Sequence, residues 1–313
     1  MKADPIPVWL VTGFLGSGKT TLLTNWLRDP SLADAALVIN ELGEVGVDDR
    51  LLASAVDSAT LLADACVCCS GLGGLEETLT ALWWDRLQRR RPRFGSVVVE
   101  TTGMADPRPI ARAFDMIPFL KERYVLAGVF TTVSSITGST LVDAYPEARA
   151  QVQAANVLIV TKCDRTPGSP LANWLRQVNP SALVALSSQA SMGWPEAYAL
   201  ILTQNGKHAH PAGQAYDGEI WQHSSMHGSA RQMHRARTRF IPLNEAVTPE
   251  SVVIRIDALQ RERAIRVKGL VKLGDGSIRA VQWALGDIEI QLSHYEGHAG
   301  STERLGLTCV LEA

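Results

Sequence analysis

The chain has 313 residues, of which 46% are hydrophobic and 20% charged, and this composition is typical of a globular protein with room for one large domain and a smaller one. Its formal net charge of −2 argues against nucleic acid or a polybasic membrane attachment as a partner. Residues 1–5 carry no apolar signal-peptide segment, and no apolar run approaches the roughly 20 residues that cross a bilayer, so we expect a cytoplasmic protein with no membrane partner.

Short apolar runs rich in β-branched residues alternate with stretches of helical periodicity between residues 8 and 200. Buried strands are predicted at residues 8–12, 36–39, 97–100, 125–133 and 157–160, and helices at 20–28 and 75–88. This alternation predicts an α/β fold with a mainly parallel sheet flanked by helices. The arginine-rich run at 86–93 is predicted to be a solvated helix end, because cations suit the carboxyl ends of helices.

The composition changes at residues 203–236, which contain several glycines and five of the seven histidines, and this stretch is predicted to be a linker. Metal binding by these histidines is an open alternative. A helix is then predicted at 249–263, with strands at 266–273 and 277–285, so the tail is expected to be a small α+β domain. The expected divisions are an α/β domain at 1–202, the linker at 203–236 and the α+β domain at 237–313.

The segment GFLGSGKT at residues 13–20 matches the phosphate-binding P-loop, and it lies between a predicted strand and a predicted helix, as that motif requires. Its glycines let backbone N–H groups turn toward phosphate oxygens, Lys19 neutralises the β and γ phosphates, and the Thr20 hydroxyl can ligate Mg²⁺. The first domain is therefore predicted to be a P-loop nucleotide hydrolase. The residues predicted to hold the phosphates and Mg²⁺ are Gly13, Gly16, Ser17, Gly18, Lys19, Thr20 and Thr21.

Base recognition is predicted at Thr161, Lys162 and Asp164, which follow a predicted buried strand. The Asp164 carboxylate can accept hydrogen bonds from both edge N–H groups of guanine, whereas it would face the acceptor N1 of adenine. The pattern therefore favours GTP over ATP as the nucleotide.

Residues 100–107 are predicted to be a switch that responds to the nucleotide, because an acidic residue closes a strand and an abrupt turn follows. Glu100 can reach Mg²⁺ through water, and the Gly103 amide can contact the γ-phosphate. Lys19, Glu100 and Asp48 are the candidate catalytic residues, with the two carboxylates organising Mg²⁺ and water. No general base, arginine finger or glutamine is evident, so slow hydrolysis is expected.

Three thiols gather within four residues at Cys66, Cys68 and Cys69, and thiolates are soft ligands that select zinc, copper(I) or similar ions. Cysteines so close together cannot easily all bind one tetrahedral ion. An open site is therefore predicted, completed by a carboxylate, a water molecule or a partner's ligand. The acidic, glycine-hinged segment at 40–49 offers Glu41 and Glu44 as oxygen ligands.

Together these motifs resemble the CobW-type family of metal-handling GTPases, whose members include zinc chaperones and metallochaperones of cobalamin synthesis. The matching segments are 13–21, Asn40 and Glu41 with Gly43 and Asp48, 66–69, 100–107, 161–164 and, in the tail, 266–269. The resemblance implies a GTPase that uses Mg²⁺, binds zinc or a similar ion such as cobalt or nickel, and delivers it to a client metalloprotein.

Three alternatives stay open at this point. A nickel- or cobalt-delivering accessory GTPase would have a nitrogen-richer metal site. A metal-buffering or metal-sensing protein would use GTP as a stabilising ligand, with incidental turnover. A small-molecule kinase would transfer phosphate to something other than water, and the thiols argue against it. The position of the tail domain makes it the natural surface for docking a client, and a purely stabilising role is the alternative. A homo-oligomer is compatible with the sequence.

Overall fold

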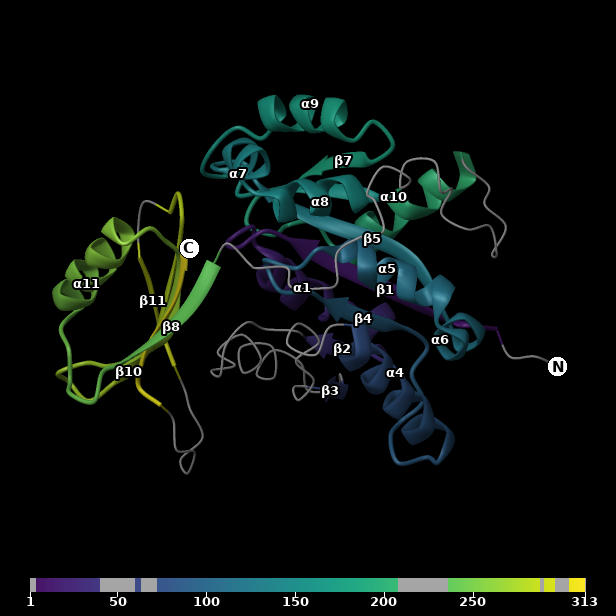
Figure 1. Ribbon diagram of the computed structural model, residues 1–313, viewed down its shortest axis with the longest axis horizontal. Helices are drawn as coiled ribbons and strands as arrows, with labels where there is room; N and C mark the ends of the chain where they lie inside the picture. The colour runs from purple at the N-terminus through teal and green to yellow at the C-terminus, as the bar shows by residue number, and fades with distance from the viewer. Residues whose placement is uncertain are drawn as a thin grey trace, which may run out of the picture.

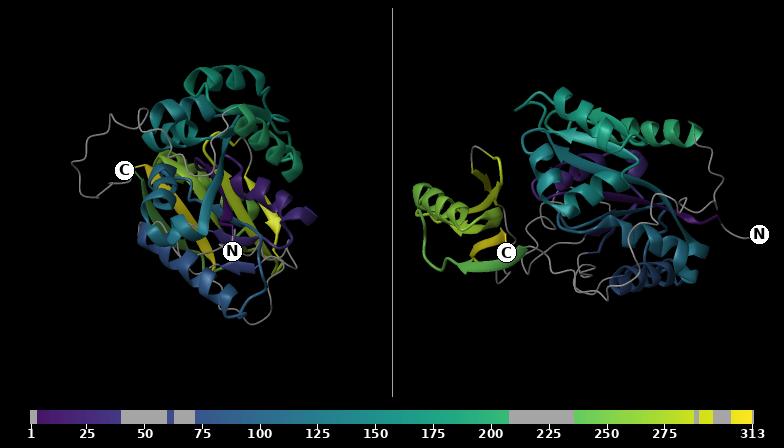
Figure 2. Two further views of the ribbon diagram at one scale, coloured as in Figure 1. Left: turned by 90° about the vertical axis from the view of Figure 1, so that its right-hand side faces the viewer. Right: turned by 45° about the horizontal axis from the view of Figure 1, so that its top comes forward.

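The structure, a computed structural model, describes residues 4–39, 60–62, 72–207, 236–287, 290–295 and 304–312. These residues form two sheets, a seven-stranded one with helices on both faces and a five-stranded one with a helix on one face (Figure 1). The views in Figures 1 and 2 show the smaller sheet at one end of the larger unit.

The larger sheet has the strand order β3-β2-β4-β1-β5-β6-β7, and all its pairings are parallel. Its strands are β1 (Ile6–Gly13), β2 (Ala36–Ile39), β3 (Thr60–Leu62), β4 (Val97–Glu100), β5 (Tyr124–Ser134), β6 (Val157–Thr161) and β7 (Leu183–Leu186). The five predicted strands are confirmed, as is the predicted parallel α/β fold. The two strands that were not predicted, β3 and β7, are short and lie at the two edges of the sheet.

Helices cover both faces of this sheet, as parallel strands require, because each crossover must return along a face. They are α1 (Lys19–Trp26), α4 (Leu72–Leu87), α5 (Pro107–Met116), α6 (Pro118–Arg123), α7 (Gly138–Ala144), α8 (Pro146–Ala154), α9 (Ser169–Val178) and α10 (Trp194–Lys207), with a short 3₁₀ helix at Pro30–Leu32. The predicted helices at 20–28 and 75–88 correspond to α1 and α4.

Alternating side chains of β1 divide the core into two layers, as the period of two in a strand dictates. Trp9 and Val11 pack with Trp26 of α1 and residues of α10 on one face. Val8 and Leu10 pack with α4, α5 and α6 on the other. The first layer holds a ring cluster in which Trp26 lies edge-on to Phe130, with centroids 5.0 Å apart. Burial of these large apolar side chains fixes α1, and hence the loop before it, on the sheet.

The smaller sheet is antiparallel, with the strand order β11-β10-β9-β12-β8. Its elements are β8 (Ala236–Pro242), α11 (Pro249–Arg261), β9 (Ala264–Lys272), β10 (Ile278–Ala284), β11 (Gln291–His294) and β12 (Gly306–Glu312). Thr248 and Ser251 form a capping box that starts α11, whose buried face includes Val252 and Ile256. The helix and two strands predicted for the tail are confirmed, within one or two residues at their ends.

The predicted linker begins inside a helix, because α10 continues to Lys207. Residues 208–235, including the predicted linker histidines, lie outside the described residues, so the domain divisions stay a prediction. Among the helices that the structure describes, none has the length and apolar character of a membrane span.

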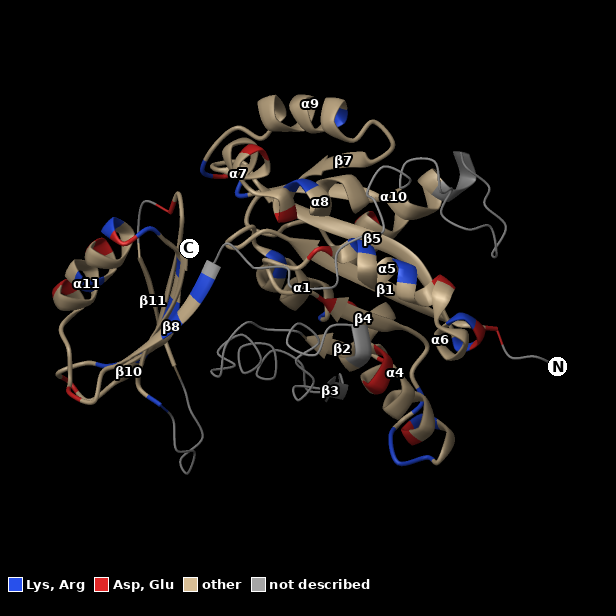
Figure 3. Ribbon diagram, in the orientation of Figure 1, with Lys and Arg blue, Asp and Glu red and all other residues tan. Residues whose placement is uncertain are grey.

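The arginine-rich run follows the end of α4 and is visible as a basic turn in Figure 3. Asp85 accepts a hydrogen bond from Arg91 at 3.1 Å and lies 3.9 Å from Arg90. The Arg86 guanidinium instead stacks over Phe94, 5.5 Å from the ring centroid. These contacts agree with the predicted solvated helix end.

Helix α4 provides a matched test of the core. Leu79 is fully buried, whereas Leu87 on the same helix is 62% exposed. We expect Leu79→Ala to lower the free energy of unfolding by about 2–5 kcal/mol, because it leaves a cavity. Leu87→Ala should change it by no more than about 0.5 kcal/mol. Urea denaturation measures both, and equal losses would contradict this packing.

Candidate nucleotide-binding site

The predicted nucleotide motifs converge at one edge of the larger sheet. Parallel strands end at the same edge, and the register pairs Val11 with Glu100, Gly13 with Thr132, and Ser134 with Thr161. The P-loop therefore follows β1 at the place where β4, β5 and β6 also end. Ligands of open α/β sheets bind at this carboxyl edge.

The P-loop needs its glycines for conformation and for close packing. Gly13, Gly16 and Gly18 have φ values of 142°, 73° and 90°, in the region that favours glycine. A Cβ on Gly13 would overlap the hydroxyl of Thr132. Gly18 is the N-cap of α1, so the first N–H groups and the positive end of the helix dipole face the loop. This arrangement suits an anion such as a phosphate.

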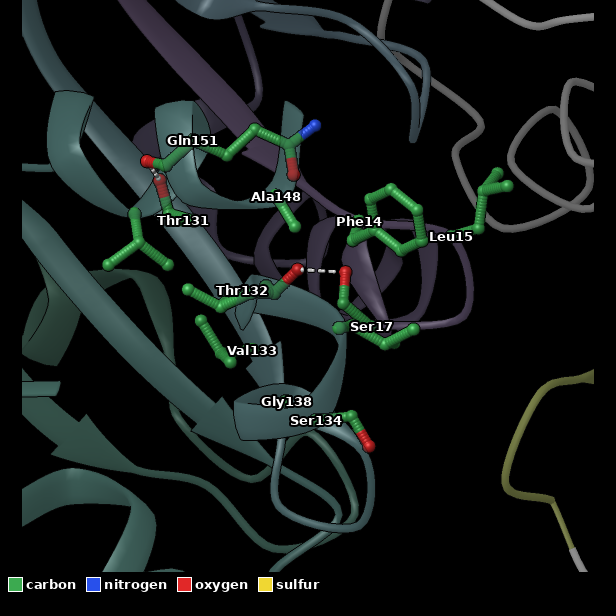
Figure 4. Close-up of a pocket in the computed structure, with 13 residues that line it drawn as sticks. Phe14, Leu15, Ser17, Thr131, Thr132, Val133, Ser134, Gly138, Ala148 and Gln151 are labelled. Carbon is green, nitrogen blue, oxygen red and sulfur yellow. Dashed lines mark hydrogen bonds between the residues drawn. The ribbon is translucent and has the colours of Figure 1, made fainter. Parts of the chain in front are cut away.

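Two hydroxyls tie the P-loop to neighbouring strands. Ser17 Oγ and Thr132 Oγ1 are hydrogen-bonded at 2.7 Å (Figure 4), and Thr161 Oγ1 donates to the Ser17 carbonyl at 2.7 Å. All three residues are at most 4% exposed, so both hydrogen bonds are shielded from water. In this structure the Thr161 hydroxyl is directed to the P-loop, and its role in binding the base stays a prediction.

Lys19, Thr20 and Glu100 form the polar centre of the site. The Lys19 ammonium donates to the carbonyls of Gly13 at 2.7 Å and Phe14 at 3.2 Å. Thr20 Oγ1 donates to Glu100 Oε1 at 2.9 Å. A hydroxyl beside a carboxylate is a hard oxygen donor set, which fits Mg²⁺, an ion that binds few protein ligands and keeps several waters. Thr21 lies in the first turn of α1 with an exposed side chain.

The predicted switch segment touches the P-loop directly. The Thr101 hydroxyl donates to Thr12 Oγ1 at 2.8 Å. A Cβ on Gly103 would lie only 2.8 Å from the backbone nitrogen of Leu15, so only glycine allows this approach. Asp106 caps α5 by accepting the Arg108 N–H at 3.0 Å, and it pairs with the guanidinium of the same arginine. The segment is therefore held at its far end and packed on the P-loop at Gly103.

Gln151 of α8 holds this segment and was not predicted. Its Nε2 donates to the carbonyls of Gly103 at 3.1 Å and Ala105 at 2.9 Å, and the residue is 1% exposed. Figure 4 shows its amide at a small pocket behind the P-loop, close to Phe14. The sequence signal for this role is that Gln151 lies among small apolar residues on the face of the helix that packs into the core. A buried polar side chain needs hydrogen-bond partners.

The base-recognition segment rests on a second loop that was also not predicted. The Cys163 N–H donates to the Ser187 carbonyl at 3.3 Å, and the Gln189 N–H donates to Asp164 Oδ1 at 2.9 Å. Lys162, Gln189 and Ala190 have φ values of 58°, 49° and 55°, and such left-handed non-glycine residues cluster at functional sites. The Gln189 N–H lowers the pKa of the Asp164 carboxyl, because this hydrogen bond favours the ionised form.

The residues predicted to bind the transported ion are not among those that the structure describes. Cys66, Cys68, Cys69, Glu41 and Glu44 lie outside the described residues, as does the candidate catalytic residue Asp48. Within the described part of the chain, no three histidine, cysteine or acidic side chains gather as a metal site would need. The thiols of Cys163 and Cys309, both described, are free and separate.

Known proteins are similar to this chain in sequence. Residues 7–185 match the family described as CobW/HypB/UreG, nucleotide-binding domain. The zinc chaperone YjiA of Escherichia coli (strain K12) is 39% identical over 161 residues, which cover 51% of this chain and 50% of that protein. The zinc-regulated GTPase metalloprotein activator 1 of Schizosaccharomyces pombe is 33% identical over 172 residues, covering 51% of this chain and 40% of that protein. The chain thus spans half or less of the length of these relatives.

A solved structure is similar in fold to this chain over nearly its whole length. The crystal structure of Zn(II)-bound YjiA GTPase from E. coli matches with a TM-score of 0.50 and 23% sequence identity, and the match covers 98% of this chain and 94% of that one. The fold of both units therefore has a counterpart among solved structures.

The contact between Gly103 and the P-loop can be tested with a Gly→Ala pair. Gly103→Ala must push the switch segment away from Leu15, whereas Gly274→Ala adds a methyl group with nothing within 4 Å. We expect Gly103→Ala to weaken a non-hydrolysable GTP analogue about tenfold, or ~1.4 kcal/mol, and GDP less, because only the analogue carries a γ-phosphate. Fluorescence titration measures both affinities. An unchanged ratio of analogue to GDP affinity in Gly103→Ala would refute this role for the contact, and Gly274→Ala should leave both affinities as they are.

Proposed function

The chain belongs to the CobW/HypB/UreG family of nucleotide-binding domains, and on that premise we propose that it is a GTP-hydrolysing metallochaperone. In this proposal Cys66, Cys68 and Cys69 bind zinc or a similar divalent ion, and the chain passes the ion to a client metalloprotein. The observation that carries the proposal is the convergence of P-loop, switch segment and base-recognition segment at one sheet edge.

Guanine selection rests on Asp164. Its carboxylate is ionised at neutral pH, as an aspartate ordinarily is, and it can accept both edge N–H groups of guanine. Adenine would present an acceptor to the same oxygen atoms and leave them unpaired. The proposed nucleotide is therefore GTP.

Phosphate binding and hydrolysis rest on the P-loop. Lys19 would move its ammonium from the Gly13 and Phe14 carbonyls to the phosphates, which are stronger acceptors. Thr20 and Glu100 would hold Mg²⁺, which supplies charge neutralisation of the phosphate oxygens when bound. Gln151 holds the carbonyls of the switch segment, so the Gly103 amide is positioned beside the P-loop. No described residue is assigned as a general base, and slow intrinsic turnover is proposed.

The segments proposed to bind the metal ion follow strands that end at the same edge of the sheet. The described chain leaves the sheet at Ile39 and at Leu62, which are the carboxyl ends of β2 and β3, and residues 40–49 and 66–69 follow these ends in sequence. Relatives named for zinc support zinc as the ion. We propose that GTP favours a metal-binding arrangement and that hydrolysis releases it.

The expected free energy of this coupling is too small for nucleotide hydrolysis alone to release the metal ion completely. Typical couplings between two sites are about 1–3 kcal/mol, whereas turning a 1:99 population into 99:1 takes about 5.5 kcal/mol. Nucleotide hydrolysis alone would therefore release the metal ion only in part. A client that binds the ion, docked in part on the second domain, completes the transfer in this proposal.

Zinc affinity in two nucleotide states tests the proposal. Competition with a chelator should give a zinc affinity at least about fivefold higher with a GTP analogue than with GDP, the lower end of typical couplings. Cys68→Ser should remove most zinc binding, because a hydroxyl is a much poorer zinc ligand than a thiolate. Cys309→Ser, at a buried thiol of the second sheet, is the control and should retain it. Equal zinc affinity in the two states would contradict the nucleotide-dependent step.

A further inference from the structure

The turn that follows β10 brings the second domain onto the nucleotide-binding edge. A Cβ on Gly16 of the P-loop would overlap the Cβ of Ala284, and a Cβ on Gly286 would overlap the Thr137 side chain just after β5. Figure 1 shows the second sheet beside this end of the larger sheet. Residues 284–287 thus contact both the P-loop and its neighbouring strand end.

An ion pair joins this turn to the base-recognition segment. Asp287 Oδ1 lies 2.7 Å from the Lys162 ammonium and 3.6 Å from the Arg165 guanidinium. The side chains of Asp287 and Lys162 are 9% and 22% exposed, so water screens their pairing only weakly. This is a charge-assisted hydrogen bond between two domains at the place where the base is expected.

Asp287 is itself firmly held by its own domain. Its second carboxylate oxygen accepts the Ala284 N–H at 3.0 Å, and its carbonyl accepts the Trp283 indole N–H at 3.3 Å. Gly286, with φ of 88°, closes the turn. The carboxylate is therefore presented to Lys162 by a fixed turn rather than by a mobile side chain.

Other contacts also join the two domains. Ile265 and Val310 of the second sheet belong to the same buried cluster as Phe14 and Leu15 of the P-loop. Burial raises the pKa of Tyr145, and the nearby Glu312 carboxylate raises it further. Apolar burial holds the domains in contact, while Asp287 selects which polar atoms meet.

We propose that Asp287 is a positioning residue of the nucleotide site, supplied by the second domain, that orders Lys162 for guanine binding. The inference rests on the proposed GTP site. A lysine side chain loses rotamer entropy when a ligand orders it, and a carboxylate that orders it beforehand removes that cost from binding. Because linkage is reciprocal, a nucleotide that binds the ordered Lys162 also strengthens the contact between the domains. Through this contact, nucleotide binding is coupled to the second domain, which is the proposed docking surface for a client.

The test removes the charge of Asp287 and keeps its shape. In Asp287→Asn the amide oxygen can still accept the Ala284 N–H, while the attraction to Lys162 and Arg165 is lost. We expect the Kd for GTP and GDP to rise about fivefold or more, with a smaller rise for ATP and an unchanged kcat at saturating GTP. Asp275→Asn is the matched control, because its carboxylate bonds to Ser277 within the turn before β10. It should change none of these values.

Two outcomes overturn the proposal. An unchanged Kd for GDP in a folded Asp287→Asn protein would show that the ion pair serves only the domain contact. A lower Kd would show that Asp287 competes with the nucleotide for Lys162. Failure of the unmodified chain to bind GTP in the same titration would instead refute the proposed function itself.

A second measurement needs no variant. Hydrogen exchange of the unmodified chain should slow at residues 278–287 when GDP is added, because nucleotide and domain contact stabilise each other. Unchanged exchange at these amides, with GDP shown to be bound, would also overturn the proposal.

Discussion

The parallel pairing of β1 with β4 and β5 determines which residues meet at the nucleotide-binding edge. It brings the carboxyl ends of these strands to one edge, so that Gly13 lies beside Thr132 and Val11 beside Glu100. From that register follow the Thr20–Glu100 hydrogen bond, the packing of Gly103 on the P-loop, and the tie between Ser17 and Thr132. The conformation of the P-loop depends on its own residues, whereas the strand pairing of the sheet determines which residues lie next to it.

A second level of organisation is the way polar contacts reach the site from a distance. Gln151 holds the switch segment from α8, and Asp287 reaches Lys162 from another sheet. Each is largely buried and hydrogen-bonded to fixed backbone atoms, which makes such contacts specific as well as stabilising. The switch segment, the base-recognition segment and the second domain are thereby held by a few residues. We propose that these contacts connect the nucleotide site to the rest of the chain.

Much of this could be predicted from the sequence, because the informative patterns are local. The P-loop, the buried strands and the turn before β10 each depend on residues close together in the chain. Gln151, Gln189 and Asp287 could not be predicted, since their partners lie 25 to 125 positions away in sequence and meet only after folding. The hydrogen bond from the Thr161 hydroxyl to the Ser17 carbonyl could not be predicted either, because the two residues are 144 positions apart in sequence.

Binding of a guanine nucleotide at this edge through Asp164 can be tested by a change of base. In Asp164→Asn the amide would present a donor to the guanine amino group, while the same donor can bond the carbonyl oxygen that replaces that group in xanthine. We expect titration of this variant to give a GTP affinity about a hundredfold lower and a higher affinity for xanthosine triphosphate. GTP and xanthosine triphosphate affinities equal to those of the unmodified chain would show that Asp164 does not bind the base.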